Sequence, residues 1–258
     1  MISPRLEQTP ACLTTKPNWP APRNVQAAVT TRGSLLTTTH SGYDNFNLAL
    51  HVEDRKENVL RNRLKLQSAL DLKHPPCWLR QTHSNTVVQA TPDIELTADA
   101  SISSTHHHAC TVLTADCLPV LFCNQQGTEV AAAHAGWRGL ANGILENTIS
   151  AMTSTPENIM AWLGPAIGPE NFEVGEEVVQ QFCGHTASAK NAFTFTRLQQ
   201  NKAHYLADIY QLARLRLQLA GVKSIYGGHF CTVEQQHLFY SFRGQQSTGR
   251  FASLIWIT

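Results

Sequence analysis

The length and composition of the chain fit a folded enzyme-sized protein. Its 258 residues, 42% of them hydrophobic, can bury a sizeable core as one large domain or two small ones. Charged residues make up only 15%, and the net charge of +1 comes without a Lys/Arg block, which argues against a nucleic-acid partner. No apolar run approaches the roughly 18 residues of a membrane span, so no membrane association is expected.

The cysteines and histidines bear on the compartment and on metal binding. Seven cysteines are scattered over the chain, an odd number at long spacing that is not a disulfide framework. The first 19 residues lack the charged and apolar regions of a secretory signal, so we expect a reduced cytoplasmic protein. Twelve histidines in a chain this poor in charge favour a metal site without locating it. Nothing in the sequence indicates an oligomeric state.

The predicted elements alternate between strands and helices along the chain. Residues 1–24 are rich in Pro and Thr and are expected to form an irregular arm before a single domain over residues 25–258. Residues 31–43, rich in Thr, Ser and Gly, are a predicted loop. Strands are predicted from apolar and β-branched runs bounded by turn residues, at 25–30, 77–90 (two strands about a turn at 83–85), 98–102, 110–114, 118–122, 129–133, 159–163, 222–226 and 252–257.

Helices are predicted where apolar residues recur on one face, at residues 53–70, 140–152, 175–183 and 205–220. Residues 187–200 fit no pattern clearly. Because strands and helices intermix without a linker, the sequence predicts one α/β domain with mixed sheets.

Three residues that suit metal binding stand where predicted strands give way to loops: His83 in QTHS, Cys117 in ADC and His134 in AHAGWRG. Two imidazoles and one thiolate suit zinc or copper. Three protein ligands leave one tetrahedral position open, as in catalytic zinc sites. On spacing alone, each residue is more often part of the core or surface than a ligand.

Two neighbouring features have alternative readings. Asp116 would orient a ligating histidine through its second ring nitrogen, or it is a turn residue. The run His106–His108 looks like a metal site, but adjacent side chains diverge, which favours a solvent loop.

Basic residues near these motifs suggest an anion site. Residues 136–139 (GWRG) lie between a strand and a helix, where backbone N–H groups and Arg138 would bind an anion, or form a tight glycine turn with an exposed arginine. Arg243 and Arg250 flank a polar turn and would add a second cationic rim.

The motifs, in order, resemble one bacterial family. They are AVTTR, QTHS, TADCLPVLF, AAAHAGWRGL, AWLGPAIGP, FEVGEEV and TGRFASLIWI, and they cover nearly the whole chain after residue 24. The family has been called multicopper polyphenol oxidase or laccase, purine nucleoside phosphorylase with adenosine deaminase activity, and peptidoglycan editing factor. The resemblance implies a layered α/β/β/α fold like that of cysteine hydrolases. It also implies a zinc site at His83, Cys117 and His134, with copper as the alternative ion.

The resemblance also implies substrates. Family members are described as cleaving adenosine, inosine, guanosine and methylthioadenosine with phosphate, and as deaminating adenosine. Two departures stand out: the loop after Arg32 lacks the usual double glycine, and Gly244 replaces the second arginine of the usual pair at Arg243. If that second arginine holds phosphate or a substrate rim, phosphorolysis would be weaker here.

Four functional hypotheses follow from the sequence. In the first, an ion on His83, Cys117 and His134 orients phosphate toward ribose C1′ or water toward purine C6. Arg138 neutralises the phosphate, with Arg32 or Arg243 assisting. In the second, Cys117 is the nucleophile of a cysteine hydrolase acting on a peptidoglycan precursor, with His134 or His83 as its base. The others are a copper oxidase, for which only one ligand set can be assembled, and a non-enzymatic nucleotide-precursor binding protein.

Overall fold

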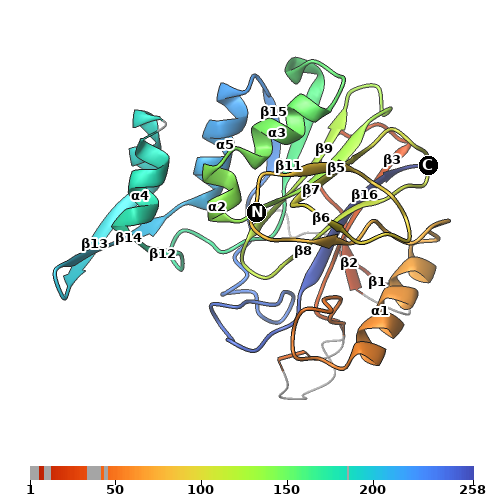
Figure 1. Ribbon diagram of the computed structural model, residues 1–258, viewed down its shortest axis with the longest axis horizontal. Helices are drawn as coiled ribbons and strands as arrows, with labels where there is room; N and C mark the ends of the chain where they lie inside the picture. Colours follow the sequence, from red (N-terminus) through yellow and green to blue (C-terminus); the bar gives the residue numbers. More distant parts are fainter. Residues whose placement is uncertain (1–5, 9–12, 34–41, 44–45, 185) are drawn as a thin grey trace.

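The computed structural model describes residues 6–8, 13–33, 42–43, 46–184 and 186–258. One of its two main sheets has five strands, all antiparallel, in the order β1-β2-β3-β16-β8. The last strand of the chain, β16, therefore lies inside this sheet between β3 and β8 (Figure 1). The bounds are β1 Leu6–Gln8, β2 Leu13–Thr15, β3 Val25–Thr30, β8 Cys110–Thr114 and β16 Phe251–Ile257.

The second main sheet has six strands in the order β15-β11-β9-β10-β7-β5. Its β11–β15 and β5–β7 pairs are parallel and the other pairs are antiparallel, so the sheet is mixed. The bounds are β5 Val87–Gln89, β7 Ala100–Ser103, β9 Leu118–Asn124, β10 Val130–Ala135, β11 Ile159–Leu163 and β15 Ser224–Gly227.

Two small sheets and the helices complete the described fold. The three-stranded sheet β12-β14-β13 projects from one end together with α4 (Figure 1), and β4 pairs with β6 in parallel. These strands are β4 Leu79–Arg80, β6 Leu96–Thr97, β12 Glu173–Gly175, β13 Phe193–Gln199 and β14 Lys202–Ala207. The helices are α1 Lys56–Ala69, α2 Trp137–Ala141, α3 Ile144–Ala151, α4 Glu176–Cys183 and α5 Ile209–Leu219, with short 3-10 turns at Pro156–Asn158 and Ala187–Ala192.

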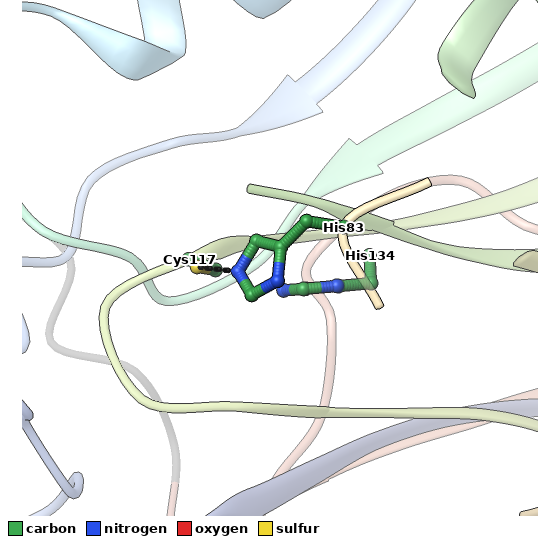
Figure 2. Close-up of side chains that lie close together, drawn as sticks. All are labelled: His83, Cys117 and His134. Carbon is green, nitrogen blue, oxygen red and sulfur yellow. Dashed lines mark hydrogen bonds between the residues drawn. The ribbon is translucent and has the colours of Figure 1, made fainter. Parts of the chain in front are cut away.

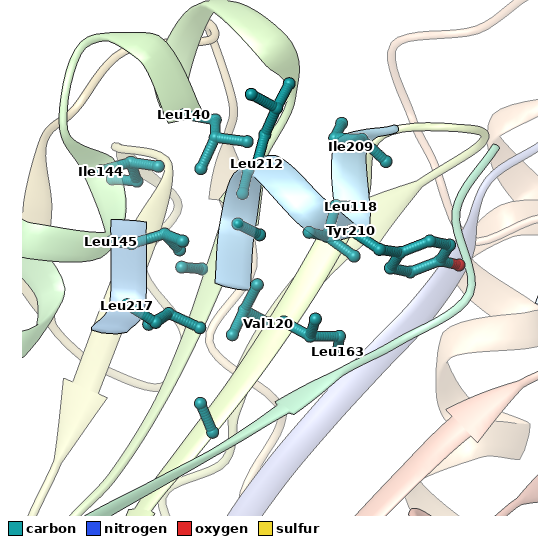
Figure 3. Close-up of a cluster of buried hydrophobic side chains, with 14 of the residues drawn as sticks. Leu118, Val120, Leu140, Ile144, Leu145, Leu163, Ile209, Tyr210, Leu212 and Leu217 are labelled. Carbon is teal, nitrogen blue, oxygen red and sulfur yellow. The ribbon is translucent and has the colours of Figure 1, made fainter. Parts of the chain in front are cut away.

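The elements form four layers around three apolar clusters. Helices α3 and α5 pack on the six-stranded sheet, where Ile144, Leu217 and Val120 belong to one buried cluster (Figure 3). A second cluster lies between the two sheets, and a third contains Leu66 of α1 together with Leu254 of β16. Each fully buried leucine or isoleucine contributes on the order of 1.5–3 kcal/mol. The predicted single α/β domain with mixed sheets is confirmed.

Some expectations about the elements are wrong. The arm expected to be irregular contains β1 and β2, and Thr14 and Thr15 of β2 are buried and pair with β3, because β-branched threonines suit a sheet. The helix predicted at 140–152 is broken into α2 and α3 at Gly143, whose φ is 90°. The helix predicted at 205–220 begins only at Ile209, after a strand, since Asp208 caps it by accepting from the Gln211 N–H. Of the loop predicted at 31–43, residues 34–41 lie outside the described residues.

Candidate metal centre

The structure brings His83, Cys117 and His134 together (Figure 2). Their potential ligand atoms all lie within 4.8 Å of one another, and the Cys117 Sγ is 3.7 Å from the His83 Nε2. The two imidazole rings meet edge to face, with centroids 4.8 Å apart. His134 is buried, Cys117 is half-buried and His83 is exposed, so the cluster is reached from solvent on the His83 side.

Strand register and a glycine explain why these side chains meet. In the β9–β10 pair, Leu118 lies opposite Ala135. Cys117 and Gly136 are the next residues beyond this pair, so they are neighbours at the open end of the hairpin. A Cβ on Gly136 would lie 2.8 Å from the His83 Cδ2 and 3.1 Å from the Cys117 Sγ. The absence of a side chain at Gly136 is therefore what lets the imidazole and the thiol approach each other.

Asp99, just before β7, holds two of the three candidate ligands. Its side chain is fully buried and accepts from the His134 Nδ1 at 2.8 Å. The same carboxylate accepts from the backbone N–H groups of Thr82, His83 and Ser84 at 3.1, 3.0 and 2.7 Å, and from the Ser84 hydroxyl at 2.6 Å. It thereby fixes the turn in which His83 has a φ of 61°, and it leaves the His134 Nε2 for an ion.

Asp99 was missed in the sequence, and the role expected of Asp116 is wrong. Asp116 accepts instead from the Thr232 hydroxyl and from the Arg243 backbone N–H, both at 2.6 Å. The physical reason is register: β7 is the neighbour of β10, so Asp99 comes to lie beside His134. The signal in the sequence that could have identified Asp99 is an acidic residue inside the largely apolar segment TADASI, residues 97–102.

The electrostatics of the cluster favour a thiolate. Burial raises the pKa of the Cys117 thiol, but His134 and His83 lower it by more, to about 6. Burial lowers the pKa of the His134 imidazole, but its hydrogen bonds to Asp99 and Cys117 raise it to about 9. Burial also raises the pKa of Asp99, and the His134 and Ser84 hydrogen bonds bring it well below its usual value. The lowered pKa of Cys117 favours the thiolate, which is the form that binds metals and acts as a nucleophile.

The predicted arginines are each held differently. Arg138 is exposed and its guanidinium carbon lies 4.3 Å from the centre of the Trp137 ring. The Arg243 guanidinium donates to the carbonyl oxygens of Asn171 and Glu173 at 3.3 and 3.2 Å.

Two further arginines complete the predicted rims. Arg32 donates to the Gln236 carbonyl at 2.8 Å. The Arg250 guanidinium donates to the carbonyl oxygens of Thr248 and Gly249 at 2.7 and 3.0 Å. Burial lowers the pKa of Arg250, while the negative charges of Cys117 and Asp116 raise it in part.

The chain is similar to known proteins over most of its length. The family model described as multi-copper polyphenol oxidoreductase laccase matches residues 26–258. The chain belongs to this family. Relatives of the laccase-like family include purine nucleoside phosphorylase YfiH of Escherichia coli, 49% identical over 243 residues, and a purine nucleoside phosphorylase of Pseudomonas aeruginosa, 48% identical over 241 residues. Each alignment covers 93% of this chain and 97% of the relative.

Solved structures in the laccase-like family share the fold. A Neisseria meningitidis protein superposes with a TM-score of 0.88 at 47% identity, covering 95% of this chain and 98% of that one. The YfiH protein of Bacillus licheniformis superposes with a TM-score of 0.84 at 26% identity, covering 97% of each chain. None of the helices in the described part of the chain is long and apolar enough to cross a membrane.

Proposed function

We propose that this protein is a metal-dependent purine nucleoside phosphorylase, with zinc as the ion and copper as the alternative. The observation that carries the proposal is the convergence of His83, Cys117 and His134 in a chain 48–49% identical to relatives named purine nucleoside phosphorylase. The substrates we propose are adenosine, inosine, guanosine and methylthioadenosine, with deamination of adenosine as a second activity. We place the enzyme in the cytoplasm.

The residues fit such an ion. The His134 Nδ1 is taken by Asp99, so Nε2 is its ligand atom, and the His83 Nε2 already lies 3.7 Å from the Cys117 Sγ. Two imidazole nitrogens and a thiolate suit zinc or copper and leave one position for a reactant. When bound, the ion would supply a fixed positive charge that orients and activates an oxygen nucleophile.

The chain's own residues have distinct tasks in phosphorolysis. An oxygen of hydrogen phosphate forms a bond to ribose C1′ and the bond between C1′ and the purine nitrogen breaks. That nitrogen takes the proton that the phosphate gives up, so the products are ribose 1-phosphate and the free base. We propose that Arg138, Arg243 and Arg32 bind phosphate and neutralise its negative charge, because the guanidinium group matches the geometry of phosphate oxygens. Asp99 keeps the imidazoles in place throughout. In deamination, water adds at purine C6 and ammonia leaves.

The test uses alanine variants of the ligands. Cys117→Ala and His134→Ala should each lower ribose 1-phosphate formation from inosine and phosphate at least about 100-fold, or about 2.7 kcal/mol in the barrier. Cys123→Ala is the matched control, because this buried cysteine lies on β9 outside the ligand group. Full activity in both ligand variants would exclude the metal role. No turnover of any nucleoside by the metal-loaded wild type would favour a binding protein instead.

One observation favours a second candidate function, a cysteine hydrolase acting on a peptidoglycan precursor. A thiol with a pKa of about 6, 3.7 Å from an imidazole nitrogen, resembles an activated nucleophile and its base. Metal analysis separates the two functions. A stoichiometric ion whose removal by a chelator abolishes phosphorolysis supports the phosphorylase, whereas hydrolysis by the metal-free protein that ends on alkylation of Cys117 supports the hydrolase.

A further inference from the structure

The histidine run at residues 106–108 meets another histidine from a distant part of the chain. The rings of His74 and His108 are in edge-to-face contact, with centroids 5.3 Å apart and an interplanar angle of 85°. We propose that His74 and His108 form a second metal site, which takes one divalent ion of the Zn²⁺, Ni²⁺ or Cu²⁺ class. These are the ions that imidazole ligands favour.

The edge-to-face contact of these two rings resembles one in the candidate metal centre. There, His83 and His134 also meet edge to face, at 4.8 Å and 71°. In both pairs, one imidazole is exposed and its partner is more buried, since His74 is exposed and His108 is half-buried. An ion can therefore enter from solvent while one ligand stays fixed in the protein.

The backbone holds the two histidines in place. The Cys77 N–H donates to the Ala109 carbonyl at 2.9 Å, and Cys77 forms a parallel bridge with Cys110. These contacts tie the segment after His74 to the segment after His108. Pro75 and Pro76 stiffen the intervening backbone, because proline fixes φ. The pair is thus a preorganised feature, which reduces the entropy lost on binding.

The donor atoms are available. Within the described residues, the ring nitrogens of His74, His107 and His108 have no hydrogen-bond partner. The His106 Nδ1 faces the Thr258 carbonyl oxygen at 3.1 Å, a contact that leaves its Nε2 outward when Nδ1 carries the proton. Neighbouring surface imidazoles whose ring nitrogens are free of hydrogen bonds can chelate a transition-metal ion.

This pair is separate from the centre at His83, Cys117 and His134. His108 precedes β8 and Cys117 follows it, so the two sites lie at opposite ends of that strand. The five residues of β8 alone span roughly 16 Å. The two sites therefore bind their ions independently, and the second does not depend on the proposed phosphorylase activity.

The experiment counts ions per chain. Metal-free protein is titrated with Zn²⁺ in competition with a chromophoric chelator, for the wild type, His74→Ala, His108→Ala and the control His229→Ala, an exposed histidine elsewhere. The wild type and the control should bind one ion more per chain than either site variant. In His74→Ala and His108→Ala, the affinity for this additional ion should be at least about tenfold lower. If the wild type binds no more than the site variants, or if the control loses the same ion, the second site is excluded.

A second measurement identifies the ligands. In spectra of the histidine ring nitrogens, Zn²⁺ should shift those of His74 and His108 at the added equivalent, and those of His229 should stay in place. Thermal unfolding of the metal-free variants shows whether they fold, and unaltered nucleoside turnover is expected because neither residue contacts the metal centre. Shifts confined to other histidines would overturn the assignment.

Discussion

Two buried aspartates flank the candidate metal centre, and they serve different sides of it. Asp99 is 0% exposed and binds the His134 imidazole together with three successive backbone N–H groups of the His83 turn. Asp116 is 9% exposed, stands next to Cys117, and binds Thr232 and Arg243 from the C-terminal part of the chain. The Asp99 carboxylate positions the candidate ligands His83 and His134. The Asp116 carboxylate connects the segment that carries Arg243, the arginine-bearing segment, to the turn that carries Cys117.

The difference shows that closeness in sequence is a poor guide to which carboxylate orients a ligand. Asp116 adjoins Cys117 yet makes its hydrogen bonds away from the imidazoles, with its backbone at a φ of 84°. Asp99 lies far from all three ligands in sequence and reaches two of them. Variants of the two aspartates should therefore separate metal binding from substrate binding.

The largest effect is expected for Asp99→Asn. The asparagine side chain would place an N–H group where the Asp99 carboxylate now accepts hydrogen bonds. At least one buried donor would lose its acceptor, at a cost of about 1–3 kcal/mol. The His134 ring and the His83 turn would lose their common anchor. Zn²⁺ affinity should fall about 10–100-fold, with phosphorolysis falling alongside, as measured by chelator competition and inosine turnover.

Glu129→Gln is the matched control for that variant. The Glu129 carboxylate also accepts from two successive backbone N–H groups and two hydroxyls, those of Thr153 and Ser154, but it lies outside the ligand group. The Glu129→Gln variant should have lower thermal stability than the wild type and the same Zn²⁺ affinity. Equal losses of Zn²⁺ affinity in both variants would mean that Asp99 acts through general stability and does not orient the ligands.

A smaller effect on the same side is expected for Gly136→Ala. The added methyl would meet the His83 ring at 2.8 Å and the Cys117 sulfur at 3.1 Å, so one ligand must move. Zn²⁺ affinity should fall about tenfold. Gly244→Ala is the control, since its Cβ would meet only the end of the flexible Gln236 side chain, at 2.7 Å, and should leave Zn²⁺ affinity unchanged. Unchanged affinity in Gly136→Ala would show that the ligands do not need this close approach.

The sequence predicted the candidate ligands because each stands in a recognisable family motif near the end of an apolar strand, with His134 as the last residue but one of β10. It could not predict Asp99, since the contact with His134 depends on the β7–β10 register, in which Ala100 lies opposite Ala133. Most strands were likewise predictable from local pattern, but their order was not. The pairing of Ser253 with Val29, near the two ends of the chain, is fixed only by the packed core.

The smallest effect is expected for Asp116→Asn, and it tests the other side of the comparison. Asparagine tolerates the left-handed backbone at this position, so the Cys117 turn should persist. Its amide has one oxygen and cannot replace both carboxylate oxygens, so either Thr232 or Arg243 loses its acceptor. The KM for phosphate or inosine should rise roughly three- to tenfold, about 0.7–1.4 kcal/mol, with Zn²⁺ affinity within about twofold of the wild type.

Thr232→Val sharpens this test because it removes only one of the two donors to Asp116 and keeps nearly the same volume. If Asp116 positions the Arg243 segment, the valine variant should raise KM by less than Asp116→Asn, because the Arg243 N–H keeps its acceptor. A loss of Zn²⁺ affinity in Asp116→Asn comparable to that in Asp99→Asn would contradict the division of roles. The two carboxylates would then form one support for the metal ligands, and the arginine-bearing segment would owe its position to other contacts, such as those of the Arg243 guanidinium with Asn171 and Glu173.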